Sequence, residues 1–245
     1  MLNDAAYELA DFNLDLPTAE SSTKTALDTL DKETAQITLG NLTRDDLAHV
    51  NLLTAAWDTM GWVYFREGNL PLAESYVQAA WKTSQASEVG GHLGQIYEKE
   101  GKLKEAAEVD ALALSAGTLT PDPSGTDAIR DRLDKLNARG YFASSKDPGE
   151  ELGKLRTISI PKISTEEGSA DFFVLLSVGK VDDVQFIHGD EQLRTAADAI
   201  KKANFPGEFP KESSARLVRR GILFCSSATK DCQFTLLLPQ SVTLQ

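Results

Sequence analysis

One pattern occurs twice in the middle of this chain of 245 residues, and it constrains the fold more than any other feature of the sequence. Gly61-Trp-Val-Tyr64 aligns with Gly94-Gln-Ile-Tyr97 at an offset of 33 residues. A fixed period near 33 with small residues at matched points is the sequence signature of stacked helical hairpins. The other matched pairs are Gly68 with Gly101, Ala73 with Ala106 and Ala80 with Ala113.

The small residues explain how such hairpins can pack. Gly61 and Gly94, with the matched alanines, let the two helices of a hairpin approach each other closely. Gly68 and Gly101 are expected to end the first helix of each hairpin, because a left-handed residue costs least without a Cβ.

A third, degenerate copy occupies residues 1–30. Leu16-Pro-Thr-Ala-Glu-Ser21 matches Leu70-Pro-Leu-Ala-Glu-Ser75 at an offset of 54, which exceeds one repeat by about 20 residues. The surplus is residues 31–53. It is expected to extend the preceding helix, turn at Gly40-Asn41 and start a new helix capped by Thr43.

After residue 117 the helical repeat ends, and breaker residues and a short helix follow. A cluster of Gly, Pro and Ser at 115–125 breaks the repeats, and a short helix that stops at Gly140 can cover the last one. The predicted first domain is 1–140, with repeats at about 1–30, 54–86 and 87–117 and a capping helix at 126–139. A linker is expected at 141–153.

From Leu155 the apolar period changes from 3.6 to 2, which predicts an antiparallel sheet with one packed helix at 154–245. Leu155–Pro161 is expected to be an edge strand, because proline sits at its end. The overall fold class is therefore a helical-repeat domain followed by a small α+β domain. The remaining expected elements are strands 171–178 and 181–188 around a Gly179-Lys180 turn, a helix from Gly189-Asp190 to about Asn204, and a hairpin of 216–225 with 232–238.

The repeat resembles the tetratricopeptide repeat (TPR) family, a family of α-solenoids, through Trp57, Gly61, Tyr64, Gly68, Ala73 and Ala80. It departs from the family at Gly90, where a large residue is usual, and in lacking the closing proline. The resemblance implies a concave groove that binds a peptide or helix of a partner protein. The partner-binding residues that it implies are Asn3, Tyr7, Asp11, Asp58, Trp62, Phe65, Arg66, Gln95, Glu98 and Lys99.

Two further resemblances concern the second half and the whole chain. The order hairpin, helix, strand, with Phe205-Pro after the helix, resembles the carboxy-terminal domain of TonB-type periplasmic proteins over residues 170–225. The stretches beginning at Leu2, Trp57 and His92 resemble the tail of bacterial periplasmic proteins with an upstream transglutaminase-like domain. These resemblances imply a periplasmic or otherwise extracytoplasmic location.

Charge and hydropathy exclude several classes of partner. Residues 1–150 carry 25 acidic and 13 basic side chains, whereas residues 151–245 carry 12 of each. The acidic half disfavours nucleic acid and anionic membrane by long-range repulsion, although the acids can equally well serve only to keep a helical array soluble. No run of 18 apolar residues is present, so no membrane span is expected. No signal peptide begins the chain, and we expect it to be a fragment.

No enzyme site is predicted. The three histidines, His49, His92 and His188, stand alone, and packing or capping is expected for His92. A nucleophilic pair of Cys225 with His188 lacks a third group to orient it. No metal signature and no phosphate-binding glycine loop occurs, so no cofactor is expected. Arg216, Arg219 and Arg220 form a basic cluster. It is interpreted either as a charged strand edge that faces acids such as Asp182 and Asp183 or as a binding site for an anionic partner.

The two cysteines favour a disulfide. If Cys225 faces Cys232 across a hairpin, Leu223 faces Phe234 and Gly221 faces Leu236, so the apolar residues meet. Such a bond implies an oxidising compartment, whereas two buried thiols would suit a reducing one.

The sequence therefore supports two functional hypotheses. The first is a non-catalytic protein-interaction module or scaffold. The second is an accessory carboxy-terminal region of a larger transglutaminase- or protease-like periplasmic enzyme. In the first, Trp62 and Phe65 are exposed aromatics, although packing on residues 31–53 or on the second domain is an alternative. The sequence specifies neither the partner nor the oligomeric state.

Overall fold

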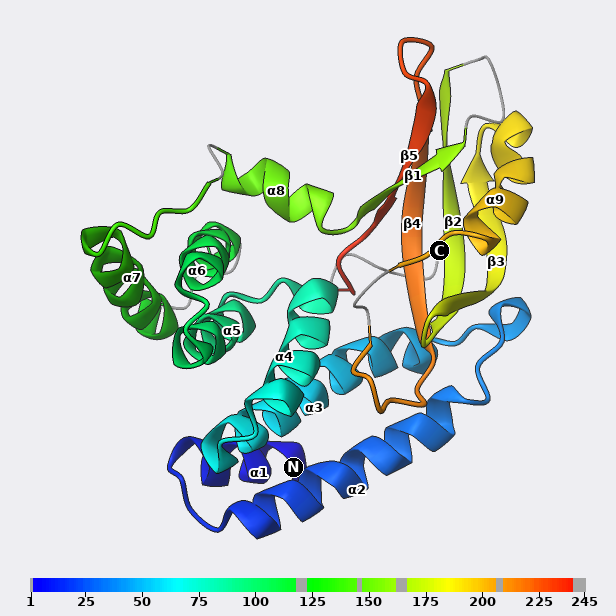
Figure 1. The fold of residues 1–245 in the computed structure, drawn as a ribbon. Helices are drawn as coiled ribbons and strands as arrows, with labels where there is room; N and C mark the ends of the chain where they lie inside the picture. Colours follow the sequence, from blue (N-terminus) through cyan, green and yellow to red (C-terminus); the bar gives the residue numbers. More distant parts are fainter. Residues whose placement is uncertain (1, 118–122, 145–146, 162–166, 206–208, 240–245) are drawn as a thin grey trace. The chain divides into compact units, whose positions relative to one another are not determined.

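The computed structural model describes residues 2–117, 123–144, 147–161, 167–205 and 209–239. Within these residues the chain is helical up to Lys154, and strands begin at Thr157 (Figure 1). The fold is of the general α+β class, as predicted. No helix in this described part is both long and apolar enough to cross a membrane.

The chain divides into two compact units. Unit 1 comprises Met1–Asp28, Leu53–Leu152 and Phe209–Lys211, and unit 2 comprises Thr29–Leu52, Gly153–Glu208 and Glu212–Gln245. The longest stretch of unit 1 ends close to the change of charge near residue 150. Residues 29–52 group with unit 2, although the sequence analysis placed them between two repeats of the first domain.

The helices follow one another in pairs joined by short turns (Figure 1). Gly68 and Gly101 end α3 and α5 with φ of 82° and 79°, so the left-handed turns predicted from the repeat are confirmed. Gly140 follows α7 in the same conformation. The helices are α1 (Leu2–Asp11), α2 (Leu16–Thr34), α3 (Arg44–Glu67), α4 (Leu70–Ser84), α5 (Ser87–Glu100), α6 (Leu103–Gly117), α7 (Pro123–Ala138) and α8 (Pro148–Lys154).

Two glycines permit the close helix contacts that the repeat predicts. A Cβ at Gly61 of α3 would overlap Val77 of α4, and a Cβ at Gly94 of α5 would overlap Asp110 of α6. Any larger side chain at these positions would push the helices apart, because packed interiors have no spare volume.

Local capping sets where α3 and α8 begin. The Asp46 N–H donates to Thr43 Oγ1 at 3.2 Å, and the Thr43 N–H donates to an Asp46 carboxylate oxygen at 2.8 Å, which confirms the predicted cap. The start of α8 corrects the expected linker at 141–153. Asp147 Oδ1 accepts from the Glu150 N–H at 3.1 Å and Pro148 occupies the first turn, so a helix forms there.

Unit 2 is built on a five-stranded antiparallel sheet with the order β1-β5-β4-β2-β3. The strand that ends at Pro161 lies at one edge, as predicted. The two predicted hairpins form, and the second has the predicted register of Leu223 with Phe234. The strands are β1 (Thr157–Pro161), β2 (Gly168–Ser177), β3 (Lys180–Gly189), β4 (Leu217–Cys225) and β5 (Asp231–Leu236).

Two expectations for the sheet connections need correction. Ser177 lies opposite Lys180, so the first hairpin turns at Val178-Gly179, one residue earlier than expected. The segment after β3 is a 3₁₀ helix, η2 (Glu191–Ala196), followed by α9 (Ala197–Lys201), and it ends before Asn204. Asp190 does not cap this helix, because its carboxylate accepts from the Ser169 N–H of β2 at 2.7 Å.

Both faces of the sheet carry buried apolar residues, although the second face is covered only in part, because Phe224 of β4 is 56% exposed on it. On one face Phe172 and Phe234 are fully buried with ring centroids 6.2 Å apart, and Leu193 and Ile200 of η2 and α9 are also buried. On the other face Phe173, Leu175 and Val218 pack with Ile37 and Leu39. This apolar contact explains why residues 29–52, which include the 3₁₀ helix η1 (Leu39–Asn41), group with the sheet.

Candidate functional site

The ten predicted partner-binding residues all lie in unit 1, on three helices. Helical spacing places Asn3, Tyr7 and Asp11 on one face of α1, since residues four apart are neighbours on a helix. The same spacing relates Asp58, Trp62 and Arg66 on α3. The remaining predicted residues are Phe65 on α3 and Gln95, Glu98 and Lys99 on α5.

Aromatic rings from the three helices stack around Trp62. The Trp62 ring stacks with Phe65, at 4.8 Å between centroids, and with His92 of α5, at 4.2 Å, and both rings are nearly parallel to it. Tyr7 of α1 meets His92 at 5.9 Å. The guanidinium carbon of Arg66 lies 4.8 Å from the centroid of the Trp62 ring, within cation–π range.

Trp62 is therefore a core residue in this structure and not an exposed aromatic. It is 3% exposed and packs with Ala6 and Ala10 of α1 and Ala19 of α2, and Phe65 is partly buried against the same cluster. Packing was the alternative left open by the sequence, and within unit 1 α1, α2 and α5 provide these contacts. Helical periodicity alone could not identify which neighbour would cover the ring.

A chain of polar groups connects the same helices beneath the stack. His92 Nδ1 lies 3.0 and 3.1 Å from the two carboxylate oxygens of Asp58. The Tyr7 hydroxyl donates to Glu88 Oε1 at 2.7 Å, and its oxygen lies 3.4 Å from His92 Nε2. Since Tyr7 donates its proton to Glu88, its oxygen can only accept from His92, which fits an imidazole protonated at both nitrogens.

The electrostatics favour the same protonation state. Burial lowers the pKa of His92, but the charge and hydrogen bond of Asp58, with the charges of Glu88 and Asp11, overcome this and raise the pKa above 6.5. Burial and the hydrogen bond to Glu88 raise the pKa of Tyr7 far above its ordinary value. The hydroxyl of Tyr7 is therefore a poor nucleophile, and the network suits the joining of helices better than catalysis.

Glu88 was not singled out from the sequence, whereas the packing expected for His92 is confirmed by its stacking on Trp62. Neither residue was predicted to take part in partner binding. They lie four residues apart on α5, so they share the face that meets Tyr7 and Asp58. This spacing of four residues was the sequence signal that could have identified the pair. The repeat comparison missed it because Glu88 aligns with Ala55 and His92 with Thr59 at the offset of 33.

Three of the predicted residues carry buried polar atoms that have no hydrogen-bond partner among the described residues. They are the side-chain oxygen of Asn3, the indole N–H of Trp62 and the Nε–H of Arg66. Arg66 uses its Nη2 to bind the backbone oxygen of Asp11 at 2.6 Å. Buried polar groups in proteins nearly always have partners, so these three atoms call for an explanation.

The structure brings six of the predicted residues together and leaves the others at the margin. Asn3 is half-buried one turn before Tyr7, and Gln95 is half-buried on α5. Glu98 and Lys99 are exposed and lie outside the contacts of the cluster. The six residues in mutual contact are Tyr7, Asp11, Asp58, Trp62, Phe65 and Arg66, joined by Glu88 and His92.

Of the basic cluster, Arg219 and Arg220 belong to β4 and Arg216 directly precedes it. The cluster is not on an edge strand, because β4 lies between β5 and β2. Arg216 binds Asp182 at 3.1 Å, as one sequence interpretation expected. Arg220 donates to Asp171 of β2 at 2.8 Å. Arg219 is 1% exposed and donates to the backbone oxygen of Leu237 at 3.1 Å. The guanidinium groups thus bind groups of unit 2 itself.

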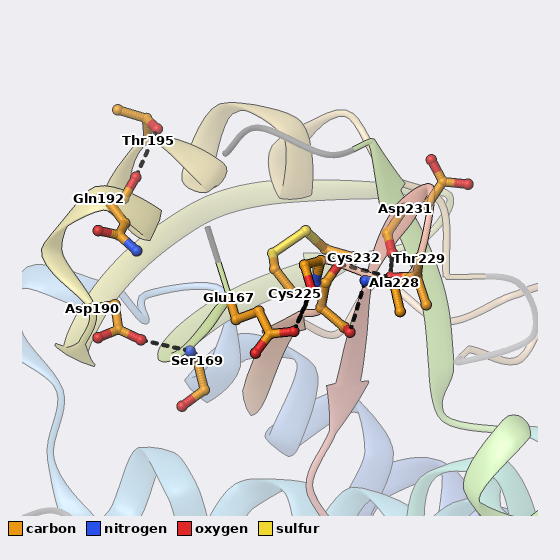
Figure 2. The surroundings of a disulfide bond; sticks show 12 residues. Glu167, Ser169, Asp190, Gln192, Thr195, Cys225, Ala228, Thr229, Asp231 and Cys232 are labelled. Carbon is orange, nitrogen blue, oxygen red and sulfur yellow. Dashed lines mark hydrogen bonds between the residues drawn. A yellow bond between two sulfur atoms is a disulfide. The ribbon is translucent and has the colours of Figure 1, made fainter. Parts of the chain in front are cut away.

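The predicted disulfide joins Cys225 and Cys232, whose Cα atoms lie 4.4 Å apart (Figure 2). Both cysteines are fully buried, and the bonded sulfur of Cys225 excludes the nucleophilic pair with His188 considered above. The loop between them is ordered by hydrogen bonds. Ser227 donates to Glu167 from its N–H at 3.1 Å and its hydroxyl at 2.6 Å.

Within the described residues no group of three or more His, Cys, Asp or Glu side chains is placed to hold a metal ion.

Comparison with known proteins gives no matching family model, no matching curated protein and no matching solved structure.

Proposed function

We propose that this chain is a non-catalytic protein-interaction module whose α1, α3 and α5 residues bind a peptide or helix of a partner protein. The observation that carries the proposal is the set of unpaired polar atoms on Asn3, Trp62 and Arg66. One is an acceptor and two are donors, which is the complement of a peptide backbone with its N–H and C=O groups. All three belong to residues for which the TPR resemblance implies a role in partner binding.

Binding at these atoms requires access to Trp62. Ala6 and Ala10 of α1 pack with Trp62, so we propose that α1 moves away from α3 when a partner binds and exposes the indole N–H. The bound partner would then form the missing hydrogen bonds in a site that excludes water, where they contribute most. The exposed Asp11, Glu98 and Lys99 would provide a polar rim around this core.

We also propose that the helical hairpins form a TPR-type array and that the sheet unit is of the TonB carboxy-terminal type. The period of 33, the left-handed Gly68 and Gly101 and the close contacts at Gly61 and Gly94 support the first assignment. The order of hairpin, short helical segment and strand supports the second. The Cys225–Cys232 bond supports an oxidising, extracytoplasmic compartment.

The test uses the indole N–H of Trp62 as the reporter. A displayed library of random peptides is selected on the folded protein, and enriched peptides are titrated into protein labelled with ¹⁵N-tryptophan. We expect the Trp62 indole signal to shift and the signals of Trp57 and Trp81 to change little. The signal is assigned with Trp62→Phe.

Matched variants make the test specific. Arg66→Ala should weaken binding about tenfold or more, whereas Lys230→Ala in unit 2 should bind like the parent protein. The proposal fails if no peptide is enriched. It also fails if enriched peptides leave Trp62 unshifted or bind Arg66→Ala with parental affinity.

A further inference from the structure

The connection between α1 and α2 presents two large apolar side chains to solvent. Phe12 is 71% exposed and Leu14 is 56% exposed, although Leu9 and Leu16 on either side of them are partly buried in the core of unit 1. Single exposed apolar residues are common, but a pair on one short turn forms a local apolar surface. We call Phe12 and Leu14, with the turn that carries them, the apolar tip.

The backbone of the apolar tip is fixed on both sides. The N–H of Leu14 donates to Leu9 O at 2.7 Å and that of Asn13 to Ala10 O at 3.0 Å, which is a Schellman end to α1. Asn13 and Asp15 have φ of 53° and 39°, the left-handed region that Asn and Asp tolerate best among residues with a Cβ.

Side chains add to this rigidity. The side-chain Oδ1 of Asp15 accepts from the Thr18 N–H at 3.4 Å and caps the start of α2, where the same N–H also donates to the backbone oxygen of Asp15 at 3.0 Å. Arg66 Nη2 donates to the backbone oxygen of Asp11 at 2.6 Å and fixes the end of α1 to α3. Apolar groups held rigidly lose little conformational entropy when a partner covers them, so the tip is suited to act as an anchor.

The surroundings of the apolar tip are acidic. Residues 1–23 contain five acidic side chains, at positions 4, 8, 11, 15 and 20, and no lysine or arginine. Glu8 and Asp15 are exposed beside the tip, whereas the carboxylate of Asp11, also exposed, is paired with Arg66 at 3.3 Å. Partial burial and the charge of Glu20 raise the pKa of Glu67, so acids crowd together where α3 ends as well. A cation brought to this region would relieve the repulsion.

We propose that the apolar tip is a docking surface for a protein segment whose apolar residues are flanked by lysine or arginine. The exposed Phe12 ring and Leu14 side chain supply the apolar contact, and the surrounding carboxylates select a cationic partner over an anionic one. The surface lies at the end of α1 opposite Asn3. The inference stands independently of the peptide site proposed at Trp62.

The test uses two synthetic amphipathic helical peptides as probes. They share one apolar stripe, and the flanking positions are all lysine in one and all glutamate in the other. Each is titrated into the ¹⁵N-labelled chain. We expect the lysine peptide to shift the backbone signals of residues 11–16 and the glutamate peptide not to bind. Binding should weaken with rising salt, because the carboxylates are exposed.

Three variants test the role of the tip. Phe12→Ser with Leu14→Ser should weaken binding of the lysine peptide about tenfold or more. Glu8→Gln with Asp15→Asn should reduce the salt dependence, and asparagine still caps α2. Phe142→Ser removes a side chain that is 62% exposed elsewhere in unit 1 and should bind like the parent protein. Circular dichroism verifies that each variant is folded.

Four outcomes would overturn the inference. They are equal binding of both peptides, unchanged binding by the Phe12 and Leu14 variant, loss of binding by Phe142→Ser, and self-association that the Phe12 and Leu14 variant abolishes. The last result would assign the surface to a second copy of this chain. The Trp62 indole signal separates the two proposals, because a shift there without shifts at residues 11–16 supports only the peptide site.

Discussion

At the scale of single residues, His92 is the side chain whose charge state the structure constrains most. It is 6% exposed and its only described carboxylate partner at hydrogen-bond distance is Asp58, while Tyr7, Glu88 and Asp11 are the other ionisable groups that act on it. Its pKa is raised in the folded protein because these acids outweigh burial. A buried imidazolium paired in this way joins α5 to α1 and α3.

This raised pKa predicts a pH dependence of stability. A folded pKa above the unfolded value near 6.5 means that the stabilisation by His92 is fully present below that pH. It is lost as the pH rises through the raised folded pKa. We expect His92→Gln to be less stable than the parent at pH 6 and the difference to shrink at alkaline pH. Urea unfolding of both proteins over this range measures it, and parallel pH profiles would contradict the assignment.

Single residues also show what the sequence could and could not predict. Gly68 and Gly101 were predictable because the left-handed region favours glycine, although Gln85 ends α4 in the same region. The burial of Trp62 was not predictable. The repeat identifies the face of α3 on which Trp62 lies, but it does not reveal that α1 packs against this face. The unpaired Trp62 N–H likewise becomes visible only when the neighbouring helices are in place.

At the scale of elements, one buried ion pair joins α6 to α7 beside α5. Arg132 Nε and Nη2 donate to the two carboxylate oxygens of Asp110 at 2.8 and 2.5 Å, and Nη2 also donates to Gly91 O at 2.9 Å. Gly94 leaves the space for this pair, since a Cβ there would overlap Asp110. Burial raises the pKa of Asp110 to about 6, and the bond and charge of Arg132 oppose the rise.

This geometry predicts an asymmetric cost of mutation. Arg132→Met leaves an uncompensated carboxylate in the core and should lower the free energy of unfolding by about 3–5 kcal/mol at neutral pH. Asp110→Leu combined with Arg132→Met removes both charges and should be distinctly more stable than the single variant. Urea denaturation of the three proteins tests this, and a double variant no more stable than Arg132→Met would disprove the role of the ion pair.

Elements differ in how far local sequence determines them. The start of α3 follows from Thr43 and Asp46, which cap it whatever the rest of the chain does. The helix after β3 is not determined locally. The sequence predicts that Asp190 caps it, but the Asp190 carboxylate accepts from the Ser169 N–H of the neighbouring strand instead. Residues 29–52 were placed with the repeats by sequence order, whereas Ile37 and Leu39 pack on the sheet. Tertiary contacts override local preference in both segments.

At the scale of the whole molecule, the acidic helical half and the neutral sheet half carry different features. The proposed binding surfaces belong to unit 1, and the disulfide belongs to unit 2. The register of the hairpin was predictable because placing Cys225 opposite Cys232 also brings Leu223 opposite Phe234 and Gly221 opposite Leu236, so the apolar residues meet. The proposed extracytoplasmic location depends on this bond.

The last prediction therefore concerns Cys225 and Cys232. Protein secreted into an oxidising compartment and then denatured without reductant should show no free thiol on titration. Cys225→Ser with Cys232→Ser should lower the free energy of unfolding by about 2 kcal/mol, at the low end for disulfides because the closed loop is short. The loss should appear in the unfolding of the sheet unit, followed by hydrogen exchange of β4 and β5. Single-serine variants control for packing, since each also breaks the bond and should be destabilised at least as much. Two free thiols in the secreted protein would remove the support that this bond gives to the proposed location.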